Sequence, residues 1–261
     1  MQFAQLILGV EPLDGGFALS VPESWHQGRT AYGGFSAALC LAAAMRAGGE
    51  GLPPLRSATF SMIAPVNGRV AVTAEVLRRG RNASWVEARI EAGGGTAFSA
   101  SLVFMGPVEC RLHRNDRPVP AGLVPAAEAR GVTYTAHTPA FLRENFESRH
   151  ALTPSGAAGP EMCRWVRLND AAGLEAMLAL VLLADALPPG VMPLLSPGVP
   201  VSTMHWQINL LTPAPVTRDG WYLLRSVGDY AEQGCSSQRM EIWNTDGAPV
   251  LAGMQSVALF G

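Results

Sequence analysis

The sequence predicts an α+β fold in which a buried helix, wrapped by a curved antiparallel sheet, occurs twice in one chain. Two observations predict it: a pair of strand-rich segments that read alike, and a run of helix-like composition ahead of each. The chain has 261 residues, of which 48% are hydrophobic and 15% are charged. This composition is typical of a packed globular protein that buries a large core.

The two strand-rich segments cover residues 60–104 and 208–260. In each segment an apolar strand ends at a proline, Pro65 or Pro213, and three further strands follow, separated by a polar bend and a glycine turn. Matching points lie about 150 residues apart, with a drift of a few residues that loop insertions would produce. The repeat predicts two equivalent units.

The two helical runs cover residues 33–49 and 168–190. The first is built from Ala and Leu and closes at a glycine pair, and the second could start at Asn169 or Asp170 and stop at a proline pair. Both runs are apolar nearly all round, so each helix is expected to be buried at the centre of its unit.

These patterns divide the chain into three parts. We expect an N-terminal unit over residues 1–106 and a C-terminal unit over residues 161–261. Residues 107–160 hold several Pro and Gly and a charged stretch, so we interpret them as a linker and edge-covering segment. A short helix is expected within it, at residues 141–146.

Composition excludes several classes of function. All 19 basic residues are Arg, so a Schiff-base lysine, a pyridoxal-phosphate site and a P-loop are excluded. A net charge of −2 without a basic run does not favour nucleic-acid binding. The cysteines lack the spacing of a zinc site or a disulfide framework, so no metal or redox cofactor is expected. They are Cys40, Cys110, Cys163 and Cys235.

The N-terminal sequence has no basic region of the kind that opens a signal peptide. The longest apolar run, residues 176–184, is far shorter than the ~20 residues needed to span a bilayer. We therefore expect a cytoplasmic protein without a membrane partner.

Five short pieces, in order along the chain, carry a family resemblance. They are Tyr32-Gly33-Gly34, Trp165-Val166-Arg167, Leu183-Ala184-Asp185, the strand PVSTMHWQINLLTP and the closing strand NTDGAPVLAGMQSVAL. With these pieces the chain resembles the acyl-CoA thioesterase II (TesB-like) family. The resemblance implies a double hotdog, with two helix-wrapped antiparallel sheets in one chain that form a pseudo-dimer. It also implies hydrolysis of an acyl-CoA thioester to a carboxylic acid and coenzyme A without a cofactor.

The resemblance places the family's catalytic Asp, Thr and Gln on Asp185, Thr203 and Gln255. Ser202 is adjacent to Thr203, so a slip of one residue would exchange the two hydroxyls. The sequence departs from the family pattern at Tyr32, where single-hotdog relatives often carry His, and at His205, which replaces an expected acidic residue. We expect Tyr32 and His205 to contact substrate, and both departures bear on substrate choice.

Asp185 is the most informative residue, because it is a lone carboxylate in the apolar stretch LVLLADALPP. Burying a carboxylate is costly unless it is paired or hydrogen-bonded, and such acids concentrate at functional sites. Asp185 would act as the base, and Thr203 and Gln255 would hold the attacking water. The structural alternative is that Asp185 caps the end of a helix and reaches solvent.

Gly33 and Gly34 open the first helix, where free amides and the positive end of the helix dipole suit a carbonyl oxygen that gains charge. The alternative is a plain turn. The first unit has Leu41 where an acid could fall, and the second has Met177 where glycines would be, so one composite site between the units is expected.

Two other functions stay open. The first is a hotdog enoyl-CoA hydratase, although the expected Asp and His pair within a few residues is missing from the sequence. The second is a non-catalytic acyl-CoA-binding protein that keeps the fold. Exposed sheet edges and faces are expected to pair, which predicts a homo-oligomer, a dimer of double hotdogs.

Overall fold

The computed structural model describes residues 2–136, 138–153 and 159–261. Its helices are α1 (Phe3–Leu8), α2 (Gly33–Gly48), α3 (Ala140–Asn145) and α4 (Ala176–Ala184), with 3-10 turns η1 (Glu23–Trp25) and η2 (Met192–Leu194). The strands of the first half are β1 (Glu11–Leu13), β2 (Gly16–Ser20), β3 (His26–Gln27), β4 (Thr30–Ala31), β5 (Leu55–Met62), β6 (Arg69–Arg79), β7 (Ala83–Ala92) and β8 (Gly95–Met105). Those of the second half are β9 (Phe146–His150), β10 (Glu161–Leu168), β11 (Val201–Leu210), β12 (Tyr222–Glu232), β13 (Cys235–Asn244) and β14 (Pro249–Leu259).

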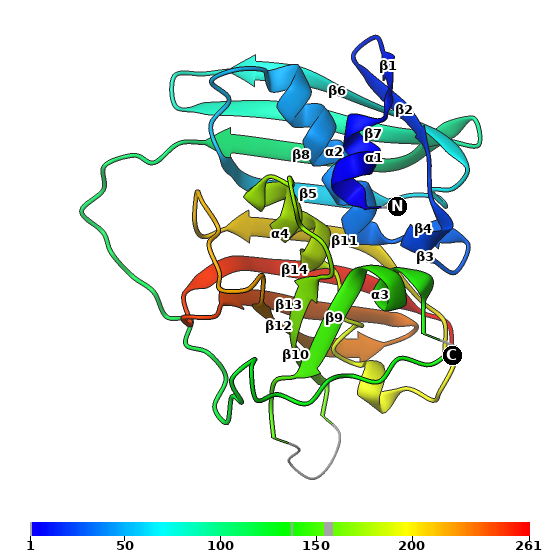
Figure 1. Cartoon of the computed structure of the whole chain (residues 1–261), viewed down its shortest axis with the longest axis vertical. Coiled ribbons are helices and arrows are strands. Elements are labelled where there is room, and N and C mark those ends of the chain that lie inside the picture. Colours follow the sequence, from blue (N-terminus) through cyan, green and yellow to red (C-terminus); the bar gives the residue numbers. More distant parts are fainter. Residues whose placement is uncertain (1, 137, 154–158) are drawn as a thin grey trace.

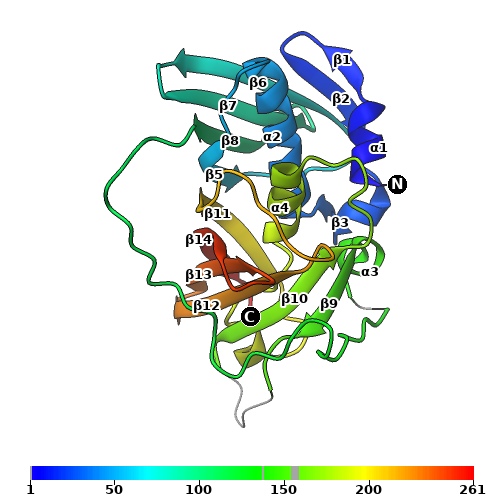
Figure 2. The same cartoon turned by 60° about the vertical axis from the view of Figure 1, so that its left-hand side comes forward.

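All strands except β3 and β4 join one antiparallel sheet of 12 strands, with α2 and α4 next to each other on one face of it (Figures 1 and 2). The strand order is β1-β2-β6-β7-β8-β5-β11-β14-β13-β12-β10-β9. Reading outward from the β5–β11 seam, each half has the same order of corresponding strands. This arrangement agrees with the predicted repeat of a helix followed by four antiparallel strands.

The expectation of two sheets is corrected at this seam. Strands β5 and β11 pair antiparallel, with Phe60 opposite Trp206 and Ala58 opposite Ile208. Because the edge strand of each half uses the other as its neighbour, backbone groups that would be exposed at two edges are paired within one sheet.

Helix α2 confirms the first helix prediction. It is buried along almost its whole length, packs on β6, β7 and β8, and stops at Gly49, whose φ of 63° suits glycine. Because Ala and Leu dominate it, the helix can approach the sheet closely on one side and α4 on another.

Helix α4 is shorter than predicted. The Glu175 carboxylate accepts a hydrogen bond from the amide of Leu178 at 2.9 Å, so Glu175 and neither Asn169 nor Asp170 is the N-cap. Asp170 instead accepts from the amide of Ala172 in a preceding turn. The helix ends at Ala184, and Asp185 takes the C-cap position. Because α4 is short, the segment that follows it covers part of the inner face of the sheet.

The middle of the chain contributes α3, which confirms the expected short helix, and β9, which pairs with the edge of β10. A segment before them covers the outer face of the second half. There, the indole of Trp165 donates to the backbone carbonyl of Val124 at 2.8 Å, and that of Trp243 donates to the carbonyl of Arg117 at 2.9 Å. Among the described residues, none of the helices has the length and apolar character needed to cross a membrane.

Candidate active site

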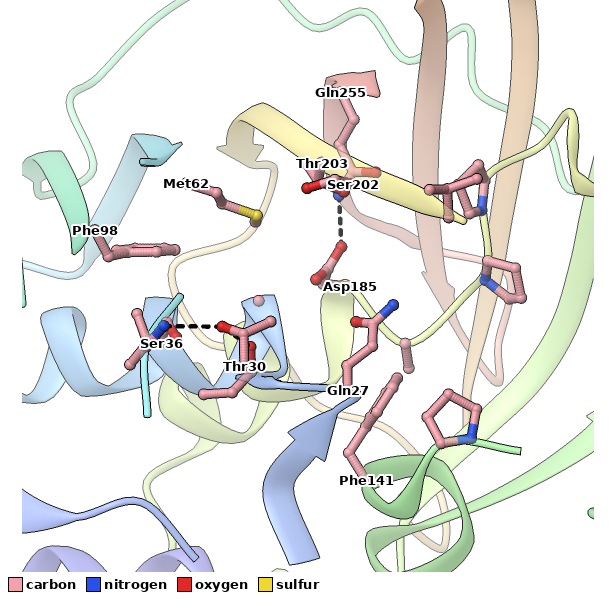
Figure 3. A pocket seen from close by; sticks show the side chains of 18 of the residues that line it. Gln27, Thr30, Ser36, Met62, Phe98, Phe141, Asp185, Ser202, Thr203 and Gln255 are labelled. Atoms are coloured by element: carbon pink, nitrogen blue, oxygen red, sulfur yellow. Dashed lines mark hydrogen bonds between the residues drawn. The ribbon is translucent and has the colours of Figure 1, made fainter. Parts of the chain in front are cut away.

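A cavity of about 410 Å³ lies where the N-terminus of α2, the end of α4 and strands β11 and β14 meet (Figure 3). Its walls come from both halves of the chain, as expected for one composite site. The lining residues with polar or aromatic side chains are Gln27, Thr30, Ser36, Phe98, Phe141, Asp185, Ser202, Thr203 and Gln255.

Asp185 projects toward this cavity from the end of α4 (Figure 3). The side-chain amide of Gln255 donates to Oδ1 of Asp185 at 2.5 Å. Burial raises the pKa of Asp185 from 3.8 to about 7, and the hydrogen bonds from Gln255 and from the backbone of Gly34 oppose this rise. The carboxyl group can therefore accept a proton near neutral pH, as a general base requires.

Gly33 and Gly34 allow α2 to approach Asp185 and α4 closely. A Cβ atom on Gly33 would collide with Oδ2 of Asp185, and one on Gly34 would lie 2.6 Å from the carbonyl oxygen of Leu182. Glycine is required at both positions because a side chain would not fit there. Backbone conformation is not the reason, since neither residue has a positive φ. The first turn of α2 thus brings its backbone amides to the edge of the cavity, where that of Gly34 donates to Asp185.

Strand register separates Thr203 from Ser202. Thr203 pairs with Val257, which is fully buried on the inner face of β14, two residues from Gln255. Residues opposite each other on paired strands point to the same face, so Thr203 and Gln255 share the inner face. Ser202 is exposed, although it also lines the cavity. Of the two hydroxyls, that of Thr203 therefore shares the inner face with Gln255.

The structure does not bring His205 to the cavity. A register shift in β11 between Thr203 and His205 turns His205 to the outer face, where it is exposed and its Nδ1 lies 3.4 Å from Oγ of Ser61. Without this bulge, Thr203 and His205 would lie on the same face of the strand.

Tyr32 is fully buried behind the cavity wall and does not line the cavity. Its ring stacks on Phe141 with the centroids 4.1 Å apart. Burial and the nearby Asp185 carboxylate raise the pKa of the Tyr32 hydroxyl well above its usual value. Tyr32 supports Phe141, which does line the cavity, so any influence on substrate acts through that contact.

Two groups of residues were missed in the sequence. Apolar side chains from distant segments also line the cavity, and they are Met62, Phe98, Phe141, Leu142 and Met192. Gln238, on β13, is 1% exposed and donates to the carbonyl oxygen of the Gln255 side chain at 2.5 Å. The sequence feature that could have identified Gln238 is its place at an inward position of an alternating strand, between Ser236 and Met240, where an apolar residue is usual.

Comparisons with known proteins identify the two halves. The family described as Acyl-CoA thioesterase C-terminal domain matches residues 115–259, and the family described as Acyl-CoA thioesterase N-terminal domain matches residues 21–105. The first match alone covers more than half of the chain. The comparison with curated proteins gave no match.

Solved structures share the fold over nearly the whole chain. A protein of unknown function with a hotdog fold from Alicyclobacillus acidocaldarius is 21% identical, with a TM-score of 0.86 and coverage of 100% of this chain and 99% of that one. An acyl-CoA thioesterase II, TesB2, from Mycobacterium marinum is 18% identical, with a TM-score of 0.77 and coverage of 98% and 97%. A tesB protein of Mycobacterium avium subs paratuberculosis is 17% identical, with a TM-score of 0.74 and coverage of 98% and 97%. These likenesses show the hotdog fold, and the two family matches show that the chain belongs to the acyl-CoA thioesterase family and is a thioester hydrolase.

Proposed function

We propose that the protein hydrolyses an acyl-CoA thioester to a carboxylic acid and free coenzyme A by direct attack of water in the cavity of Asp185, Thr203 and Gln255. The observation that carries this proposal is the Asp185 carboxyl group, which faces the cavity, is held by Gln255 and has a pKa of about 7. A group with this pKa takes up and releases a proton at neutral pH.

In this mechanism the thioester carbonyl oxygen points at the first turn of α2. The amide of Gly33 there would stabilise the negative charge that develops on that oxygen, while the amide of Gly34 donates to Asp185. Water, oriented by Asp185, Gln255 and the Thr203 hydroxyl, attacks the carbonyl carbon while Asp185 accepts its proton. The tetrahedral intermediate then collapses, the carbon–sulfur bond breaks, and Asp185 returns the proton to the coenzyme A thiolate.

The apolar part of the cavity lining suits the acyl chain. Met62, Phe98 and Phe141 line the cavity that Asp185 faces, and hydrocarbon transferred there from water is stabilised by about 0.8 kcal/mol per buried CH₂ group. The reacting carbonyl would lie beside Asp185, Thr203 and Gln255, with the acyl chain against the apolar lining residues.

The symmetric strand order about the β5–β11 seam supports a double hotdog in which residues 1–106 and 161–261 form a pseudo-dimer, linked by residues 107–160, which also supply the edge strand β9 of the second half. The composite cavity suits this arrangement, because each half supplies groups that the other lacks. The cytoplasmic location and the dimer of double hotdogs stay predictions from the sequence.

Thioester hydrolysis is tested with a panel of acyl-CoA esters of increasing chain length, by measuring the release of free thiol. Hydrolysis of at least one chain length, with CoA and the acid formed in equal amounts, is the expected result. Stabilisation of the protein by every acyl-CoA without thiol release would instead support the acyl-CoA-binding alternative. Hydration of an enoyl-CoA without thiol release would support the hydratase alternative.

The rate is expected to depend on pH through Asp185. The base is active when ionised, and its pKa is raised to about 7, so kcat should increase as the pH rises from 5 to 8, with a midpoint near 7. A pH profile of kcat with one ester checks this. A carboxylate of ordinary pKa would give a flat profile over that range and would contradict the role of burial.

The two neighbouring hydroxyls can be separated by mutation. Thr203→Ala should lower kcat about tenfold, because loss of one hydrogen bond to the water costs roughly 1 kcal/mol or more. Ser202→Ala, one residue away on the other strand face, should change kcat less than twofold. A larger effect at Ser202 than at Thr203, measured by the same thiol-release assay, would reverse the assignment.

A further inference from the structure

Four groups form a continuous hydrogen-bond series that ends at the candidate base. The backbone amide of Gly190 donates to Oε1 of Gln238 at 2.7 Å, and Nε2 of Gln238 donates to Oε1 of Gln255 at 2.5 Å. Nε2 of Gln255 then donates to Oδ1 of Asp185 at 2.5 Å. Gln238 and Gln255 are directly opposite in the β13–β14 register and are 1% and 4% exposed, so bulk water does not compete for these groups.

The series has one direction, and Gly190 sets it. A glutamine amide has similar shape in its two orientations, with an acceptor at one end and a donor at the other. A backbone amide can only donate, so Gln238 must turn its oxygen to Gly190 and its NH₂ group to Gln255. Gln255 must then accept at its oxygen and present its NH₂ group to Asp185.

The Gly190 amide is itself held in place. A Cβ atom on Gly190 would lie 2.5 Å from the backbone nitrogen of Gly228 and 2.8 Å from the carbonyl oxygen of Ser226, and one on Gly228 would collide with Val191. The segment after α4 is therefore pressed against β12 at two glycines. Asp185 and Gly190, five residues apart, are both tied to the sheet by the glutamine pair.

We infer that Gln238 is a positioning residue for hydrolysis, which fixes the orientation of the Gln255 amide so that it donates to Asp185 and keeps its second N–H for the cavity. This inference rests on the proposed roles of Asp185 and Gln255. Gln238 does not line the cavity, so it acts only through Gln255. The titratable group that faces Asp185 is Tyr32, at the N-cap of α2, and the other groups that act on the pKa of Asp185, Gln255 and the Gly34 amide, do not titrate.

Gln238→Met tests the inference, because Met has a similar length but neither donates nor accepts these hydrogen bonds. The Gln255 amide would then be free to rotate. Because its donor to Asp185 is no longer fixed, kcat should fall roughly 3-fold to 30-fold, about the effect of losing one hydrogen bond, while KM changes less than twofold. The midpoint of the pH profile should rise, because Asp185 loses a fixed donor.

Ser226→Ala is the matched control: Ser226 is fully buried on the neighbouring strand and its hydroxyl has no hydrogen-bond partner among the described residues. It should leave kcat and the midpoint unchanged.

Gln238→Glu gives a second test, which is independent of the first and remains usable if the Met variant does not fold. An un-ionised carboxyl group can copy the Gln amide, with its carbonyl accepting from Gly190 and its O–H donating to Gln255. Once ionised it only accepts, so Gln255 must reverse and turn its oxygen to Asp185. The variant should therefore show a loss of kcat on the alkaline side that the wild type lacks.

Two outcomes are distinguished by adding Asp185→Asn to the series, with thermal melts of every variant. If Asp185→Asn abolishes activity but both Gln238 variants keep the wild-type pH profile, the positioning role is wrong and the proposed base stands. If Asp185→Asn retains wild-type activity, the proposed base is wrong, whatever the Gln238 variants show. An alkaline loss in Gln238→Glu together with a raised midpoint in Gln238→Met supports the inference.

Discussion

Asp185→Asn should lower kcat for thioester hydrolysis by about 10²–10⁴, the usual contribution of a positioned general base, and should leave KM little changed. The substitution preserves the size of the side chain but removes the group that accepts the proton. Because the cavity walls stay the same, ground-state binding of the acyl chain should persist. The measurement is thiol release from a medium-chain acyl-CoA at several concentrations, for wild type and variant.

The same variant gives a stability signature with a definite sign. In the folded protein the pKa of Asp185 is about 7, whereas an unfolded Asp has a pKa of about 3.9. The folded state therefore binds its proton more tightly, and the free energy of unfolding of the wild type should fall as the pH rises from about 4 to about 7. The variant lacks this loss. The difference in Tm, variant minus wild type, should increase between pH 5 and pH 8.

Two results would count against these expectations. Wild-type hydrolysis by Asp185→Asn would make Asp185 a structural C-cap of α4. A difference in Tm that stays constant from pH 5 to pH 8 would mean that the carboxyl group is not desolvated in the folded protein. The two measurements are independent, so the role and the environment of Asp185 can be judged separately.

Local patterns in the sequence predicted much of the architecture. The repeat of a helix and four strands could be found because each unit carries its own proline, bend and glycine turn, and α2 is marked by an unbroken apolar run. Asp185 could be singled out because a lone carboxylate in an apolar segment is costly to bury. These are all properties of contiguous residues.

What the sequence missed depends on contacts between distant residues. The bulge between Thr203 and His205 breaks the period of two, so alternation alone places His205 on the wrong face. The N-cap of α4 at Glu175 was not predicted, because the only feature that marks it is an acidic side chain, and acidic side chains are common. Alternation marks Gln238 as a polar residue at an inward position, but only the strand register shows that it lies opposite Gln255.

The packing of α2 against Asp185 leads to the second large expected effect. Gly33→Ala should lower kcat about 100-fold, because the added methyl group would collide with Oδ2 of Asp185 and lie 2.7 Å from Cε of Met62. The end of the Met62 side chain can rotate away, whereas the Asp185 carboxylate is tied to Gln255. A displacement of about 1 Å of a catalytic group can cost about 10²-fold in rate.

The control for this variant comes from the same substitution elsewhere. Ala is favoured over Gly within a helix by up to about 1 kcal/mol, so backbone propensity alone predicts no loss of stability from Gly33→Ala. Gly106→Ala places a methyl group in open space and should leave both kcat and Tm near the wild-type values.

If Gly33→Ala also hydrolyses the ester at the wild-type rate, the contact between α2 and the carboxylate does not constrain the reaction. A loss of kcat with an unchanged Tm would instead show that glycine is needed there for catalysis, because the first turn of α2 must lie against the group that activates water.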